Sequence, residues 1–137
     1  MSWDDHNRRR AAIKSVLAYA ATNPTSGLPY DYVPEAKAHF RDRRELLLAL
    51  QYEWSQALWG RIELHSLDPR GRALTDASEV ARLAWSDCAA KYPVLRRLLD
   101  AHREEIGPSG QRERDLLDPA AIGHSPDQRM YQASYVA

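Results

Sequence analysis

One stretch of the chain decides its fold: residues 34–65 read PEAKAHFRDRRELLLALQYEWSQALWGRIELH. Apolar side chains recur there at the three- and four-residue spacing of a helix face, and Tyr52 and Trp59 extend the apolar surface to a second face. A helix this apolar is usually central in its domain or shared with a partner subunit. Pro34 suits the first helical turn. The stretch therefore predicts one long helix, or two helices if the chain breaks near Asp42, where a second start pattern occurs.

Three shorter helical segments accompany the long one. The first covers about residues 5–21, and an aspartate at its start can cap its free amides. The next begins at Thr75 or Asp76 and ends or bends at Pro93, and the last continues from Pro93 to Ile106. No segment alternates apolar and polar residues over a useful length. The predicted fold class is therefore all-α, a compact bundle of four helices, or five if the long helix breaks.

The end of the chain has a different composition. Residues 108–137 contain several prolines and glycines and few branched apolar side chains. Such a segment is flexible when alone but can dock on a folded surface. We therefore expect a helical bundle domain, residues 1–107, followed by an irregular C-terminal arm, residues 108–137.

The overall composition excludes several classes of protein. The chain has 137 residues, enough for one domain, and its 19 basic residues balance its 19 acidic residues. This balance gives no global attraction to nucleic acid or to an anionic membrane. No apolar run approaches the roughly 18 residues needed to span a bilayer, and a single cysteine, Cys88, excludes an internal disulfide. We therefore expect a cytoplasmic protein that does not associate with membranes.

The sequence lacks motifs for catalysis, metal binding and cofactor binding. A di-metal helical bundle needs Glu-x-x-His on two helices, whereas the five histidines of this chain are scattered and none completes that pattern. Cys88 lies among apolar neighbours on its predicted helix and is expected to be an inert core residue. Neither a glycine-rich nucleotide motif nor a serine-hydrolase motif is present. We therefore expect no metal, no cofactor and no catalytic residue, which favours a non-enzymatic role.

Aromatic residues give the strongest functional signal. Four Trp and seven Tyr stand against one Phe, a bias towards side chains that are enriched at interfaces. Trp54 and Trp59 are five residues apart, about 140° around a helix, so we expect one to pack inside and the other to meet a partner, unless both belong to the core. Aromatic residues of the proline-rich loop and of the arm suit docking into a groove, or they cover their own bundle. The candidates for partner contact are Trp54, Trp59, Arg61, Tyr30, Tyr32, Tyr131 and Tyr135.

Nucleic acid is the second candidate partner. The basic clusters Arg8-Arg9-Arg10 and Arg96-Arg97 could contact phosphates if they share a face. Residues 74–99 also have a faint helix-turn-helix pattern, with Trp85-Ser86-Asp87 as the turn. Two features oppose this interpretation: Pro93 falls inside the second helix of the motif, and acidic residues lie beside each basic cluster.

A third hypothesis is an apolar ligand held inside the bundle between Tyr52, Trp54 and Trp85. Of the three, protein–protein contact is favoured. The sequence thus predicts a helical adaptor, regulator or accessory subunit that binds another protein or a second copy of itself.

Overall fold

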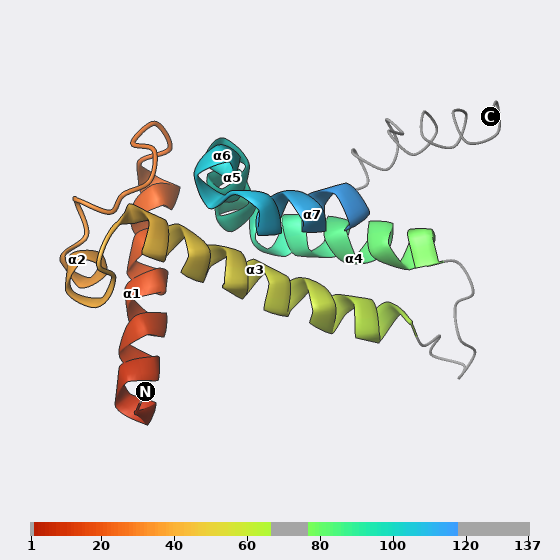
Figure 1. Cartoon of the computed structure of the whole chain (residues 1–137), viewed down its shortest axis with the longest axis horizontal. Coiled ribbons are helices and arrows are strands. Elements are labelled where there is room, and N and C mark those ends of the chain that lie inside the picture. The colour runs from red at the N-terminus through yellow and green to blue at the C-terminus, as the bar shows by residue number, and fades with distance from the viewer. Residues whose placement is uncertain (1, 67–76, 118–137) are drawn as a thin grey trace. The chain divides into compact units, whose positions relative to one another are not determined.

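The chain is all-helical wherever its structure is described. A computed structural model describes residues 2–66 and 77–117 (Figure 1), and these residues form seven α-helices and no β-strand. The helices are α1 (Trp3–Thr22), α2 (Pro34–His39), α3 (Arg43–His65), α4 (Ala77–Lys91), α5 (Pro93–Ala101), α6 (Arg103–Ile106) and α7 (Pro108–Leu117). The all-α class is confirmed for this part of the chain, and the arrangement of the helices as one compact bundle stays a prediction.

The described residues form two more helices than the five predicted for a broken long helix. The long helix does break, into α2 and α3, and the last predicted helix breaks at His102 into α5 and α6. The other additional helix lies in residues 108–137, which were expected to be irregular. Their first ten residues form α7, because Pro108 is tolerated in a first turn and the following polar residues are compatible with a helix. The rest of the predicted arm, residues 118–137, lies outside the described residues.

Helix α1 begins at Trp3, two residues before the predicted start. Ser2, not an aspartate, is its N-cap: the Ser2 hydroxyl accepts from the Asp5 amide at 3.1 Å, and the Ser2 amide donates to the Asp5 carboxylate at 3.4 Å. This reciprocal pair is a capping box. Hydrogen bonding with Ser2, through its side chain and then its backbone, lowers the pKa of the Asp5 carboxyl. The capping box therefore sets the first residue of α1 at Trp3.

The break between α2 and α3 lies at the second start pattern. Phe40 has an extended backbone, with φ −124° and ψ 130°, and the Asp42 carboxylate accepts from the Glu45 amide at 2.8 Å, which caps α3. The carbonyl of Phe40 accepts a hydrogen bond of 2.6 Å from the buried Tyr30 hydroxyl. The alternative of two helices is therefore correct, and a side chain from the proline-rich loop satisfies the backbone where the helix is interrupted.

The chain divides into two compact units, Met1–Ser55 with Tyr92–Ile106 and Gln56–Lys91 with Gly107–Ala137. In the first unit α1 contacts α2 and α5, and the core includes Phe40, Leu47, Leu50 and Trp54. Arg97 of α5 donates to the Ala20 carbonyl near the end of α1 at 2.8 Å. The first unit is therefore assembled from two stretches that are far apart in the sequence.

Two contacts join the start of α3 to α6 in the same unit. Arg43 pairs with the Glu105 carboxylate at 3.2 Å, and Arg44 donates to the Glu105 backbone carbonyl at 2.6 Å. Arg41 also pairs with Glu45 at 3.5 Å, so the neighbouring arginines Arg41, Arg43 and Arg44 all have partners within the protein.

The second unit contains α4 and α7, which contact each other and lie side by side in Figure 1. The His65 ring at the end of α3 pairs with the Asp87 carboxylate of α4 at 2.5 Å between Nε2 and Oδ2. Helix α4 is continuous through Trp85-Ser86-Asp87, so the turn of the predicted helix-turn-helix pattern is wrong. None of these three residues is a glycine or proline, and the helix buries Val80, Ala81, Ala84, Trp85 and Cys88.

No helix among residues 2–66 and 77–117 combines the length and the apolar character that a membrane crossing requires.

Candidate functional site

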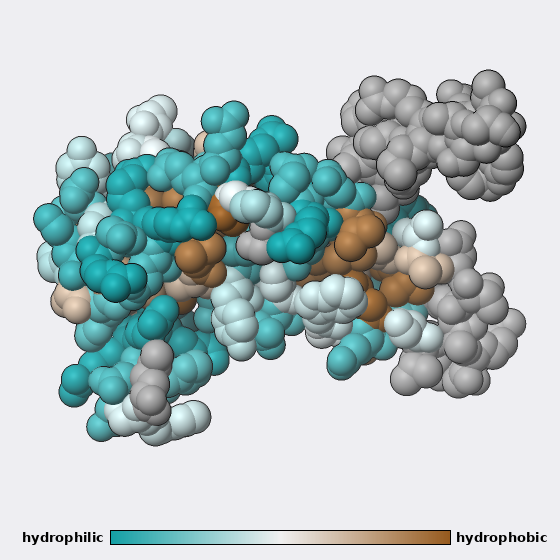
Figure 2. Space-filling model, in the orientation of Figure 1, coloured by the Kyte–Doolittle hydropathy of each residue, from teal (hydrophilic) through white to brown (hydrophobic). Residues whose placement is uncertain are grey.

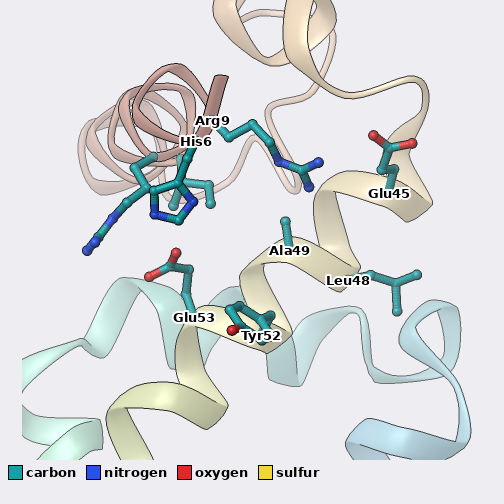
Figure 3. Close-up of a pocket in the computed structure, with 9 residues that line it drawn as sticks. His6, Arg9, Glu45, Leu48, Ala49, Tyr52 and Glu53 are labelled. Carbon is teal, nitrogen blue, oxygen red and sulfur yellow. The ribbon is translucent and has the colours of Figure 1, made fainter. Parts of the chain in front are cut away.

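A groove of about 380 Å³ lies in the first unit between the first halves of α1 and α3. Figure 3 shows that the two helices contribute opposite walls, with His6 and Arg9 on α1, and Ala49 and Glu53 on α3. Glu53 points from α3 towards His6. The residues that line the groove are His6, Arg9, Arg10, Ile13, Glu45, Leu48, Ala49, Tyr52 and Glu53.

Apolar and aromatic side chains are exposed around this groove. Tyr52 is 62% exposed and Leu48 is 39% exposed, although both belong to an otherwise apolar helix. Trp3 is 76% exposed and stacks on the His6 ring, with 5.9 Å between the ring centroids. The surface over the N-terminal half of α1 is otherwise largely hydrophilic in Figure 2. A cluster of exposed apolar side chains within a polar surface is typical of an interaction site.

The spacing along α3 explains how the groove is shaped. Leu48 and Tyr52 are one turn apart on the same face, and the half-buried Ala49 lies beside that face with only a methyl side chain. Ile13 of α1 is buried and supplies apolar surface to the same groove. A small side chain next to two large ones therefore leaves space at Ala49.

Charged residues of both signs line the same groove. The Arg9 guanidinium lies over the Phe40 ring, 4.9 Å from its centroid, and Glu45 pairs with Arg41 at 3.5 Å. Arg10 and Glu53 form no hydrogen bond or ion pair with the residues that the structure describes. One uncompensated charge of each sign, one from each helix, is thus available to a partner.

The two tryptophans of α3 have opposite environments. Trp54 is fully buried, and the Arg96 guanidinium lies 4.4 Å from its ring centroid. Trp59 is 52% exposed. The five-residue spacing predicts that one tryptophan is buried and the other is exposed. Of the two, Trp59 is therefore the one whose side chain is accessible to a partner. Arg61 is partly exposed in the second unit, where its charge acts on Cys88.

The remaining partner candidates are also separated by the structure. Tyr30 is buried and holds the α2–α3 break through its hydroxyl. Tyr32 is exposed and stacks on Tyr19, with ring centroids 5.9 Å apart. Tyr131 and Tyr135 lie outside the described residues. Tyr30 thus has a structural role, while Tyr32 is a surface aromatic.

The basic clusters do not form one phosphate-binding surface. Arg96 is buried and pairs with Asp100 at 3.0 Å, and Arg97 donates to the Ala20 carbonyl. In the other cluster Arg9 covers Phe40, which leaves Arg8 and Arg10 exposed. The expectation that Arg96 could contact phosphate is therefore wrong, because its charge is used inside the first unit.

Two residues of the predicted ligand pocket, Tyr52 and Trp54, have opposite environments. Tyr52 is exposed, whereas Trp54 is fully buried two positions later on the same helix. The third residue, Trp85, is a buried residue of α4. Residues this close along a helix face different directions, so Tyr52 and Trp54 do not line a common pocket.

Two kinds of reactive site are relevant among the described residues: a reactive thiol at Cys88 and a metal-binding cluster that includes histidine. Burial raises the pKa of the Cys88 thiol, while the charge of Arg61 opposes this shift. A buried, protonated thiol is a poor nucleophile. Over residues 2–66 and 77–117, no group of three or more His, Cys, Asp or Glu side chains could hold a metal ion.

The sequence predicts only a nucleic-acid contact for Arg10 and does not single out Glu53 or Ala49. The usable signal was the small Ala49 next to the large Leu48 and Tyr52 on α3, but only the fold shows that α1 lies beside them. No protein family, curated protein or solved structure matches this chain.

Proposed function

We propose that this protein is a non-enzymatic adaptor, regulator or accessory subunit that acts through protein–protein contact at the groove between α1 and α3. The observation that carries the proposal is the exposure of Tyr52 and Leu48 at the groove, beside the small Ala49. Large exposed aromatics around a small hollow are the usual anchors of protein interfaces. Glu45 and Glu53 offset the charges of Arg9 and Arg10 in the lining, so the groove offers phosphates no net positive charge.

The cytoplasm is the compartment we propose for this contact. The free thiol of Cys88 suits a reducing environment, and the balanced charge of the chain suits a partner other than an anionic membrane.

The test is site-specific photo-crosslinking in cells. A photoreactive phenylalanine derivative replaces Tyr52 in the full-length chain, and the same residue placed at the exposed Ala38 of α2 is the matched control. We expect a discrete protein adduct from position 52 that is absent from position 38. Adding Ala49→Arg, which fills the hollow, should remove the adduct, whereas Ala38→Arg should not.

Circular dichroism of both arginine variants checks that their helices are intact. Equal crosslinking from positions 52 and 38, or none from position 52, would overturn the proposal.

A further inference from the structure

We propose that the protein seated in the groove between α1 and α3 is a second copy of this chain. This inference rests on the proposed function and names the partner. In a two-fold dimer the same surface patch is used on both subunits, so the patch must be complementary to itself. The groove is self-complementary in shape and in charge.

Complementarity in shape comes from α3. Ala49 provides a hollow, and Tyr52, one turn further along the helix, provides a protruding ring on the same surface. Side chains of two helices interlock when ridges of one enter grooves of the other. In a symmetric pair, Tyr52 of each subunit fills the hollow at Ala49 of the other, so each copy supplies both the protrusion and the space. Leu48, on the same face of α3 as Tyr52, adds exposed apolar surface to the contact (Figure 3).

Complementarity in charge comes from both helices. Arg10 on α1 and Glu53 on α3 line the groove, and neither is paired with a described residue. A two-fold axis relates a contact from Arg10 to Glu53 with a second contact from Glu53 to Arg10. Each dimer therefore forms two equivalent ion pairs from side chains that have no ionic partner within the described chain.

The balance of charge in the groove selects this occupant over others. Arg9 and Arg10 face Glu45 and Glu53, so the lining carries two charges of each sign. A wholly acidic partner would meet the two glutamates, and a wholly basic partner would meet the two arginines, because like charges in contact are destabilising. A partner that carries both signs avoids both conflicts, and the groove of a second copy of this chain carries both.

The test uses charge reversal in the full-length protein, with its mass in solution measured by sedimentation equilibrium over a concentration series. We expect the unmodified chain to form a dimer. Arg10→Glu and Glu53→Arg should each raise the dimer dissociation constant about tenfold or more, because each turns two attractive contacts into repulsive ones. The matched controls are Arg103→Glu and Glu104→Arg, exposed reversals on α6 that should leave dimerisation unchanged.

Mixing the two single variants gives the decisive result. A heterodimer of Arg10→Glu with Glu53→Arg has one acidic and one basic residue at both ion-pair positions, so the mixture should associate more tightly than either variant does alone. The double variant Arg10→Glu, Glu53→Arg should dimerise by itself for the same reason. Failure of the mixture and of the double variant to recover association would overturn the inference, as would a dimer that neither reversal weakens.

Failure of this inference differs from failure of the proposed function. If the chain is monomeric at all concentrations but position 52 still crosslinks a different protein, the groove is a contact site and its occupant is not a second copy. If the chain is monomeric and position 52 crosslinks nothing, both proposals fail.

Discussion

The guanidinium of Arg96 lies over the indole ring of Trp54, with its central carbon 4.4 Å from the ring centroid. Both side chains are buried, and Arg96 also pairs with Asp100 at 3.0 Å. The contact joins α5 to α3 within the first unit, across a long separation in sequence. A residue that looks like half of a basic surface cluster is therefore a structural link.

Removing this link should destabilise the first unit. Arg96→Ala loses a desolvated cation–π contact and the packing of the arginine stem, so we expect a loss of about 2 kcal/mol in the free energy of unfolding. Arg96→Lys keeps the charge but not the planar stack and should lose less. Urea unfolding followed by tryptophan fluorescence measures both. Arg103→Ala, at an exposed site on α6, is the control and should change stability by less than about 0.5 kcal/mol; an equal loss there would contradict the assignment.

The hydrogen bond from Tyr30 to the Phe40 carbonyl should also be measurable. Tyr30→Phe keeps the ring but leaves a buried carbonyl without this 2.6 Å donor, so we expect a loss of about 1–2 kcal/mol in stability. Thermal unfolding by circular dichroism reports the change. Tyr32→Phe removes a hydroxyl from an exposed ring and serves as the matched control. If both variants melt at the same temperature, the Tyr30 hydroxyl does not support the α2–α3 break.

Two glycines should respond to alanine in opposite directions. Gly27 has φ +71°, in the left-handed region, so Gly27→Ala is expected to destabilise the protein by roughly 1 kcal/mol. Gly60 lies within α3, and a Cβ there meets no atom within 4 Å. Gly60→Ala should therefore stabilise the protein by about 0.5–1 kcal/mol, because alanine is the better helix former. Denaturant midpoints of the two variants, compared at equal m-value, test the prediction; two shifts of the same sign would refute it.

The thiol of Cys88 should be protected in the folded protein. Because burial raises its pKa, the folded state keeps the thiol protonated while the unfolded chain loses its proton near a pH of about 8.5. The contribution of Cys88 to stability is therefore complete below the unfolded pKa and declines as pH rises from there towards the folded pKa. Alkylation by iodoacetamide at pH 8.5 should be much slower without denaturant than with it. In Cys88→Ala, measured over the same pH range, this part of the loss of stability at alkaline pH should be absent. If the thiol is alkylated at comparable rates with and without denaturant, it is accessible in the folded protein and the prediction is wrong.

Much of the local structure could be predicted from the sequence because it depends on neighbouring residues. The break near Asp42 follows from a capping residue at the right place, and the opposite environments of Trp54 and Trp59 follow from their angular separation. The true cap, Ser2, was missed because Asp4 and Asp5 are equally good capping residues by type, and only the backbone geometry distinguishes them.

The groove could not be predicted in the same way. It needs α1 beside the first half of α3, and nothing in residues 5–21 specifies that neighbour. The role of Arg96 was hidden for a related reason: its partner Trp54 is remote in sequence, and a pair of adjacent arginines is usually solvent-exposed. Helix α7 was missed because prolines and glycines around residues 108–117 resemble a loop, although Pro108 stands at a first turn.

The divided first unit has a consequence for synthesis of the chain. Met1–Ser55 leave the ribosome long before Tyr92–Ile106, which complete the same unit. Until then the Trp54 ring lacks the guanidinium of Arg96, and the end of α1 lacks the side chain of Arg97. Nascent chains that end within residues 56–91 therefore expose apolar side chains of α3 that the later helices of the unit bury. Exposed apolar surface of this kind is prone to aggregation and is bound by chaperones. Completion of the unit waits for α5 and α6 to emerge, so the order of translation makes these two short helices the last step in burying the core.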